Sequence, residues 1–252
     1  AREEASFRGY TVVDPATGTW GWKRFDEITP GDVVPLAMDS VFGEPHTVAL
    51  PPLGEPYWAS NPEIQAPRTV TPELAELVGY FMGDGSLHSK GLRFCVTAGD
   101  EDVVARLTDI IHRLFHAEVH ATPRTGYTEL AVHSVALAMW WEACGFAKQT
   151  PSGSPDHTGK GYQPHIPDAI LATNDRAVYE SFLRGLFEAD GTIIAGVPAF
   201  STGHLEFARE IAVLFLALGY PTSEKVDQSG WGHADVHVIR LRNVSYNEVF
   251  RT

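Results

Sequence analysis

Two aspartates in matching settings are the residues of this chain best suited to do chemistry. Asp84 and Asp190 stand 106 positions apart, and each ends an apolar run and precedes a glycine. The two runs are Leu77-Val78-Gly79-Tyr80-Phe81-Met82-Gly83-Asp84-Gly85 and Leu183-Arg184-Gly185-Leu186-Phe187-Glu188-Ala189-Asp190-Gly191. One such run alone would indicate an ordinary helix end and turn. The matched pair is an internal repeat and indicates one shared site.

Small residues explain how the two runs could meet. Gly79 and Gly83 lie four apart in the first run, and Gly185 and Ala189 lie four apart in the second. On a helix this spacing leaves a groove on one face, where another backbone can approach closely. Glycine within a helix costs about 1 kcal/mol relative to alanine, so a contact must offset that cost. We predict that the two helices pack together.

This packing would bring Asp84 and Asp190 together at the C-terminal ends of their helices. The negative end of each helix dipole and the second carboxylate both disfavour ionisation unless a cation is present. A divalent metal between the carboxylates resolves the conflict, and ligands that are all oxygen suit Mg²⁺.

The remaining pattern places these helices in two similar halves. Each half reads as helix, two strands, helix, two strands, which predicts a mixed α/β protein with a pseudo-twofold axis. We assign residues 73–174 to the first half and residues 175–252 to the second. The expected elements are helices over 72–83, 101–114, 135–144, 176–190 and 205–218, and strands over 92–97, 118–120, 128–134, 192–194, 198–201 and 235–243.

Two further segments precede the halves. Residues 1–44 read as short strands separated by turns. Residues 45–72 contain seven prolines and no helical period, so we interpret them as an extended linker from one domain to the next.

The paired runs resemble the double dodecapeptide signature of the LAGLIDADG homing endonucleases. Sequence from about Gly9 to Asn243 is similar to the endonuclease-bearing inteins found in ribonucleotide reductases. The resemblance implies a monomeric, site-specific endonuclease that cuts both strands of a long, asymmetric double-stranded DNA target. It also implies that Asp84 and Asp190 bind Mg²⁺, that each directs cleavage of one strand, and that the carbonyls of Gly83 and Ala189 complete the coordination.

The same resemblance implies one lysine in each half that positions the attacking water. In the second half Lys225 is the expected residue. In the first half the family pattern places a basic residue close to an Ile-Pro pair, and here His165 precedes Ile166-Pro167 while Lys160 lies farther upstream. The first site would therefore use Lys160 or His165, or be degenerate.

The N-terminal segment carries part of a second resemblance. Residues 25–36, with the turn Pro30-Gly31-Asp32, are similar to the splicing (Hint) domains of inteins. Splicing in that family needs Cys or Ser at the first residue and a terminal His-Asn pair. The chain as given starts with Ala1 and ends with Thr252, so splicing is not expected of it.

Strand alternation indicates which residues would contact DNA. In the last strand Val236, Val238 (or Ile239) and Leu241 are expected to point inward, with Arg240 and Arg242 outward. Arg93 would project similarly from an early strand. Arginine reads guanine bidentately in the major groove, although exposed strand arginines can also serve solubility alone.

The overall charge weakens the expectation of DNA binding. The net charge is −13, whereas proteins that neutralise phosphates usually carry a basic surplus. DNA contacts only one face, so we predict basic residues on one surface and acidic ones opposite. The alternative function is a catalytically degenerate DNA-binding or structural insertion domain of an intein.

Several other classes receive little support. The chain has no apolar run of about 18 residues and opens on no signal peptide, so we expect a cytoplasmic protein. Two cysteines are too few for a disulfide scaffold. His112, His116 and His120 are spaced by four, but the helical pattern fades after Phe115, so ordinary surface histidines are the better interpretation than a zinc site.

Overall fold

The computed structural model describes residues 9–35, 43–54, 62–149, 162–228 and 235–242. The chain divides into two compact units, Ala1–Val41 and Phe42–Thr252. In the first unit β1 (Gly9–Val13) pairs antiparallel with β2 (Trp20–Arg24), and a single-turn helix η1 (Phe25–Glu27) follows. Lys23 Nζ lies 2.6 Å from Asp32 Oδ1 and ties the hairpin to the segment after η1.

The first half of the second unit follows the predicted element order. It contains α2 (Pro72–Asp84), β3 (Gly85–His88), β4 (Gly91–Thr97), α3 (Glu101–Phe115), β5 (His120–Pro123), β6 (Tyr127–His133) and α4 (Val135–Ala143). The antiparallel strands lie in the order β3-β4-β6-β5. The short helix α5 (Asp168–Leu171) precedes the second half.

The second half repeats this arrangement. It contains α6 (Arg176–Asp190), β7 (Gly191–Ile194), β8 (Val197–Thr202), α7 (Leu205–Ala217), β9 (Thr222–Gln228) and β10 (Asp235–Leu241). Its strand order, β7-β8-β10-β9, is equivalent to that of the first sheet. The predicted fold of two αββαββ halves with a small N-terminal β segment is therefore confirmed.

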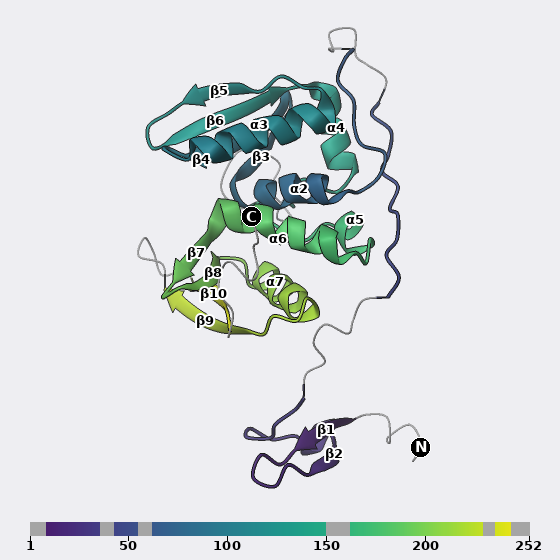
Figure 1. Cartoon of the computed structure of the whole chain (residues 1–252), viewed down its shortest axis with the longest axis vertical. Coiled ribbons are helices and arrows are strands. Elements are labelled where there is room, and N and C mark those ends of the chain that lie inside the picture. Colours follow the sequence, from purple (N-terminus) through teal and green to yellow (C-terminus); the bar gives the residue numbers. More distant parts are fainter. Residues whose placement is uncertain (1–8, 36–42, 55–61, 150–161, 229–234, 243–252) are drawn as a thin grey trace. The chain divides into compact units, whose positions relative to one another are not determined.

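Helices α2 and α6 lie side by side between the two sheets (Figure 1). A Cβ added to Gly79 would lie 1.9 Å from the backbone oxygen of Phe182, and one added to Gly185 would lie 1.8 Å from that of Glu76. No side chain fits at either position, so the two backbones are in direct contact. The predicted packing of the repeat helices is confirmed.

Three N-cap residues were predicted, and two of them cap their helices with a side-chain hydrogen bond. The Thr71 side chain accepts a hydrogen bond from Leu74 N, and the Asp175 side chain accepts one from Ala177 N. Asp100 occupies the N-cap position of α3, but its side chain makes no capping hydrogen bond. The prediction that Asp100 caps this helix is thus right in position and wrong in mechanism.

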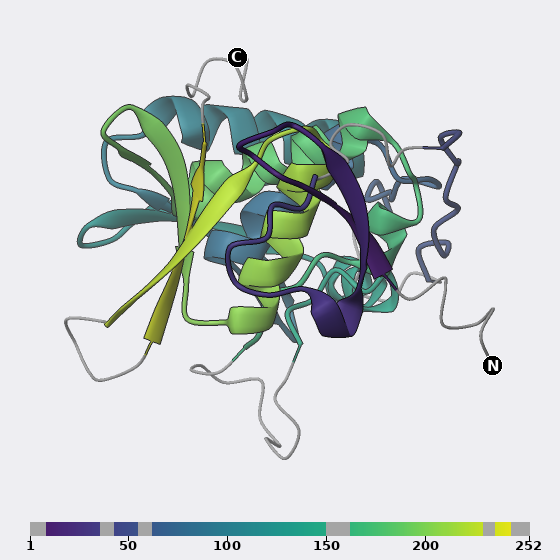
Figure 2. The ribbon, with the colours of Figure 1, turned by 90° about the horizontal axis from the view of Figure 1, so that it is seen from below.

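Each sheet turns one face toward helices and the other, called here the outer face, away from them. Helix α7 lies across one face of the β7–β10 sheet, as Figure 2 shows. On β10 the buried residues are His237, Ile239 and Leu241, so Val236 and Val238 share the outer face with Arg240. The expectation that Val236 and Val238 point inward is wrong, whereas the alternative Ile239 and the predicted Leu241 do point inward. A buried histidine, paired through Nδ1 with Glu224 Oε1 at 2.9 Å, shares this inner register.

The described parts of the proline-rich segment, residues 45–54 and 62–71, belong to the second unit and contact its core. Residues near 49 and 69 form a β-bridge, and Leu50 is buried in the main core. The indole nitrogen of Trp140 donates a hydrogen bond to Pro51 O at 2.7 Å. Among the described helices, none is long and apolar enough to cross a membrane.

Candidate active site at the crossing of the two repeat helices

Asp84 is the last residue of α2 and Asp190 is the last residue of α6. The helices are so close here that a Cβ on Gly83 would lie 2.5 Å from Ala189 Cβ and 3.0 Å from Asp190 Oδ2. Burial raises the pKa of Asp84 to about 6, and the nearby Asp190 charge adds to the increase. Burial also raises the pKa of Asp190. The structure thus brings together the two carboxylates that the repeat predicted.

Lys148 supplies a positive charge to this pair. Its ammonium group donates a hydrogen bond from Nζ to the backbone oxygen of Gly83 at 2.6 Å. The charge of Lys148 opposes the increase in the pKa of both Asp84 and Asp190. Burial lowers the pKa of Lys148 itself, while the two aspartates favour its charged form. A half-buried ammonium therefore lies near the half-buried carboxylate of Asp84 and the more exposed carboxylate of Asp190.

The sequence interpretation missed Lys148 because no local motif marks it. A tight reversal after α4 positions the residue: Gly145 has a φ of +74°, and Trp141 Nε1 donates to the backbone oxygen of Phe146 at 2.9 Å. Phe146 is fully buried against Trp140 and Trp141. The only signal available was a lysine two residues after a large aromatic anchor, which is too common to be diagnostic.

The residues expected to supply the basic group are not found at the carboxylates. Lys225 lies on β9, is 74% exposed and has its Nζ 2.5 Å from Asp227 Oδ1. His165 Nε2 lies 3.2 Å from Gly145 O, and burial lowers the pKa of His165 while Glu210 and Asp168 raise it. Lys160 lies outside the described residues. Within the described part of the chain, Lys148 is the lysine that the structure brings to the pair.

The donor set suits a hard divalent cation. Asp84 and Asp190 offer carboxylate oxygens, and no group of three or more His, Cys, Asp or Glu side chains able to hold a metal occurs among the described residues. Mg²⁺ binds through one or two carboxylates and takes its other ligands from water and substrate phosphates, so two carboxylates fit it. The carbonyl of Gly83 already accepts from Lys148 but has a second lone pair, and Ala189 lies directly beside it.

The predicted DNA-contacting arginines lie toward solvent, with neighbours that restrain two of them. Arg93 is on the outer face of β4, and its Nη1 lies 3.9 Å from Glu129 Oε2. Arg240 donates from Nη2 to the backbone oxygen of Ile194 at 2.9 Å. Arg242 is exposed just after β10.

Charge is only partly separated between the two sides of the second unit. Apart from Asp84 and Asp190, acidic residues outnumber basic ones on its described helices, with Glu73, Glu76, Glu101, Asp102, Asp109, Glu142, Asp168, Glu180, Glu188, Glu206 and Glu210 against Arg106, Arg113, Arg176, Arg184 and Arg209. The outer faces are mixed, however, because Glu129 lies near Arg93 and Asp227 pairs with Lys225.

Sequence comparison gives two partial relatives. The chain is 26% identical over 198 residues to glutamine–fructose-6-phosphate aminotransferase (isomerizing) of Methanocaldococcus jannaschii, covering 76% of this chain and 17% of that protein. It is 26% identical over 149 residues to the replication factor C small subunit of the same organism, covering 58% of this chain and 7% of that protein. The chain therefore spans less than a fifth of either relative.

Structural comparison gives low similarity to solved proteins. A structure of mesophilic variants of the homing endonuclease I-DmoI has a TM-score of 0.49 at 16% identity, covering 68% of this chain and 89% of that one. Full-length DUF199/WhiA from Thermatoga maritima has a TM-score of 0.46 at 14% identity, covering 71% of this chain and 53% of that one.

A family model matches the second half of the chain. Residues 177–251 match the LAGLIDADG-like domain. The match begins one residue into α6 and therefore includes Asp190 and all four strands of the second sheet. The second half of the repeat is thus similar to the LAGLIDADG-like domain.

Proposed function

We propose that this protein is a site-specific DNA endonuclease that uses Mg²⁺ to hydrolyse one phosphodiester bond in each strand. The observation that carries the proposal is the meeting of Asp84 and Asp190 at the crossing of two equivalent helices, with the ammonium of Lys148 beside them. A pseudo-twofold site offers one carboxylate to each strand of a duplex. The LAGLIDADG-like domain of the second half supports the same assignment.

In this proposal the aspartates hold the metal, with the carbonyls of Gly83 and Ala189 next to it. A bound divalent cation would lower the pKa of a water molecule and would neutralise charge on the phosphate. Because the protein provides few ligands, we expect metal and DNA to bind together, with phosphate oxygens completing the shell. Asp84 and Asp190 are ionised when the cation is bound, since it removes the repulsion that raises their pKa values.

Lys148 is the basic group that we assign to the reaction, in place of Lys160 or His165. An ammonium has three donors, and one of them is engaged with Gly83 O. The other two are available to a phosphate oxygen or to the attacking water. Lys225 could serve the second strand only if DNA binding separates it from Asp227.

We further propose that the chain is the endonuclease part of an intein. Similarity to small portions of an aminotransferase and of a replication protein supports this, because a segment shared by proteins of unrelated function is typical of an inserted element. The β hairpin of the first unit would belong to a splicing domain. Ribonucleotide reductase as the host, the monomeric state and a cytoplasmic location remain predictions.

A DNA-binding domain without nuclease activity is the second candidate. It is favoured by the presence of one lysine, rather than two, at the carboxylates within the described residues. The acidic partners of Arg93 and Lys225 favour a weaker DNA contact as well.

Cleavage of supercoiled plasmids that carry uninterrupted ribonucleotide reductase genes, in Mg²⁺, tests the proposal. We expect linear product from the wild type, none from Asp84→Asn or Asp190→Asn, and normal cutting by Asp109→Asn, which changes an exposed carboxylate on α3. A wild type that binds the plasmid without cutting it would establish the second candidate. Equal cutting by the two site variants would overturn the assignment of the site.

A further inference from the structure

Two contacts enclose the turn that carries Lys148. On one side of this lysine, His165 Nε2 lies 3.2 Å from the backbone oxygen of Gly145. On the other side, Gln149 and Gln163 form an antiparallel bridge in which each backbone N–H donates to the other residue's oxygen at 2.9 Å. The turn from Gly145 to Gln149 is therefore attached at both ends to the segment that contains His165.

The contact between His165 and Gly145 has a defined donor. A carbonyl oxygen can only accept, so Nε2 of His165 carries a hydrogen and donates it to Gly145. Gly145 has a φ of +74°, and it reverses the chain after the C-terminal end of α4, three residues before Lys148. His165 thus holds the backbone at the point that sets the direction of the turn.

Hydrophobic packing fixes only part of this turn. Phe146 is fully buried, whereas Lys148 is half-buried and both Gly145 and Gln149 are exposed. A buried side chain is held by the atoms that surround it, and an exposed residue lacks most of those contacts. The polar contacts with the segment of His165 therefore hold the two exposed residues on either side of Lys148.

The segment that contains His165 is itself held in place. Ile166 is 4% exposed, and its backbone N–H donates to Glu210 Oε2 on α7 at 3.0 Å. Gln163 and Ile166 each precede a proline, which favours an extended backbone at both residues. Core packing and a charge-assisted hydrogen bond thus fix the segment independently of Lys148, so it can support the turn.

We propose that His165 is a positioning residue, which holds the turn so that the Lys148 ammonium stays at the backbone oxygen of Gly83. Lysine carries its ammonium on a flexible stem, so the group is held at one acceptor only when the backbone beneath it is fixed. The sequence predicted His165 as a basic group of the reaction, and in this proposal it acts through Lys148 instead. The inference rests on the proposed nuclease function for its effect on cleavage, whereas the placement of Lys148 can be measured in the metal-free protein.

Acetylation of the metal-free protein by acetic anhydride at constant pH, read by mass spectrometry, tests the placement. We expect His165→Ala to raise the rate of acetylation at Lys148 by about fivefold, the change in population that accompanies loss of one hydrogen bond. The rate at Lys225, whose side chain is 74% exposed, should stay the same. In His165→Gln the rate at Lys148 should be close to that of the wild type, because the amide nitrogen can donate to the same carbonyl.

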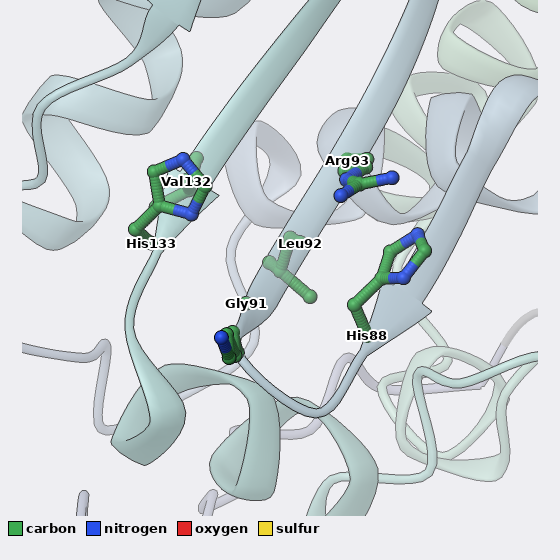
Figure 3. A pocket seen from close by; sticks show the side chains of 7 residues that line it. His88, Gly91, Leu92, Arg93, Val132 and His133 are labelled. Carbon is green, nitrogen blue, oxygen red and sulfur yellow. The ribbon is translucent and has the colours of Figure 1, made fainter.

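The matched control for the acetylation experiment is His88→Ala. His88 is a half-buried histidine at the end of β3, where it lines a small pocket together with Arg93 (Figure 3). Its replacement is expected to leave the acetylation rate of Lys148 unchanged. An unchanged rate in His165→Ala, or a rise of the same size in His88→Ala, would overturn the inference.

Single-turnover cleavage in Mg²⁺, on a plasmid that the wild type linearises, tests the consequence for the reaction. We expect His165→Ala to cut about tenfold more slowly, because a small displacement of a positioned group is costly, with DNA binding in Ca²⁺ unchanged. In a protein that already carries Lys148→Met, adding His165→Ala should have no further effect, because the histidine acts through the lysine. An effect that persists undiminished in that protein would overturn the inference. A wild type that cuts no plasmid would count against the proposed function alone, since the acetylation rates establish or overturn the inference without DNA.

Discussion

The ammonium of Lys148 lies 2.6 Å from the backbone oxygen of Gly83, the residue immediately before Asp84. This contact connects the loop after α4 to the end of α2. It also places a positive charge beside two carboxylates whose pKa values are raised by burial. The charge of Lys148 thus favours the ionised aspartates that a metal requires.

Replacing this lysine tests its assignment to the reaction. We expect Lys148→Met to slow plasmid cleavage by about 100-fold, because removal of one positioned donor from a nuclease site costs that much. DNA binding measured in Ca²⁺ should change little. Lys225→Met, which removes an exposed ammonium paired with Asp227, should have the smaller effect on cleavage. The opposite ranking of the two variants would assign the role to Lys225.

The raised pKa of Asp84 predicts how stability depends on pH without metal. The pKa is 3.8 ordinarily and about 6 in the folded protein, so between these values the folded state binds more protons than the unfolded state. The free energy of unfolding therefore falls as pH rises from 4 to 6. Allowing for partial exposure, we expect Asp84 to contribute about 1 kcal/mol to this fall. Urea unfolding in EDTA should show a smaller decline in the free energy of unfolding for Asp84→Asn than for the wild type. Identical pH profiles of the two proteins would contradict the raised pKa of Asp84.

The glycines of the helix crossing are expected to be intolerant of a methyl group. In Gly79→Ala and Gly185→Ala the new Cβ would lie within 2 Å of a backbone oxygen of the other helix. The helices must then separate, and we expect a loss of about 3 kcal/mol in the free energy of unfolding. Gly54→Ala is the matched control, because its Cβ would meet no atom within 4 Å. A control as destabilised as the two helix variants would refute the explanation.

Glu76 holds three helices together and should be sensitive to loss of its charge. Its Oε1 lies 2.6 Å from Arg106 Nη2 on α3, and its Oε2 lies 3.4 Å from Arg184 Nη1 on α6. The carboxylate is 12% exposed, so Glu76→Gln leaves two guanidinium groups poorly compensated. We expect thermal and urea unfolding to show a loss of about 2 kcal/mol. Glu206→Gln, which breaks an exposed pair with Arg209, should be nearly neutral.

The repeat in the sequence predicted the architecture because its features depend only on residue spacing within one helix. Gly79, Gly185 and the terminal Asp84 and Asp190 lie on single helices, where a spacing of four residues defines a face. Thr71 and Asp175 capped their helices for the same local reason. These features need no knowledge of distant contacts.

The features that could not be predicted depend on register and on chain reversals. Lys148 reaches the site through a turn fixed by Gly145 and by burial of Phe146, neither of which has a distinctive spacing to Asp84. On β10, hydrophobicity favoured Val236 and Val238 (or Ile239) as inward residues, but the inward set is His237, Ile239 and Leu241. His237 is buried although its partner Glu224 is exposed, so a polar residue takes an inward position that a count of apolar residues does not assign to it.

The direct contact between the backbones of α2 and α6 has a consequence for the origin of the protein. Both helices present small residues at the crossing, so either half alone would carry a surface complementary to a second copy of itself. Such a half could have assembled as a symmetric dimer before duplication and fusion joined two copies. Fusion would then free each copy to diverge, and the two halves do differ where the first has His88 and Arg93 and the second has Ile194 and Ala199.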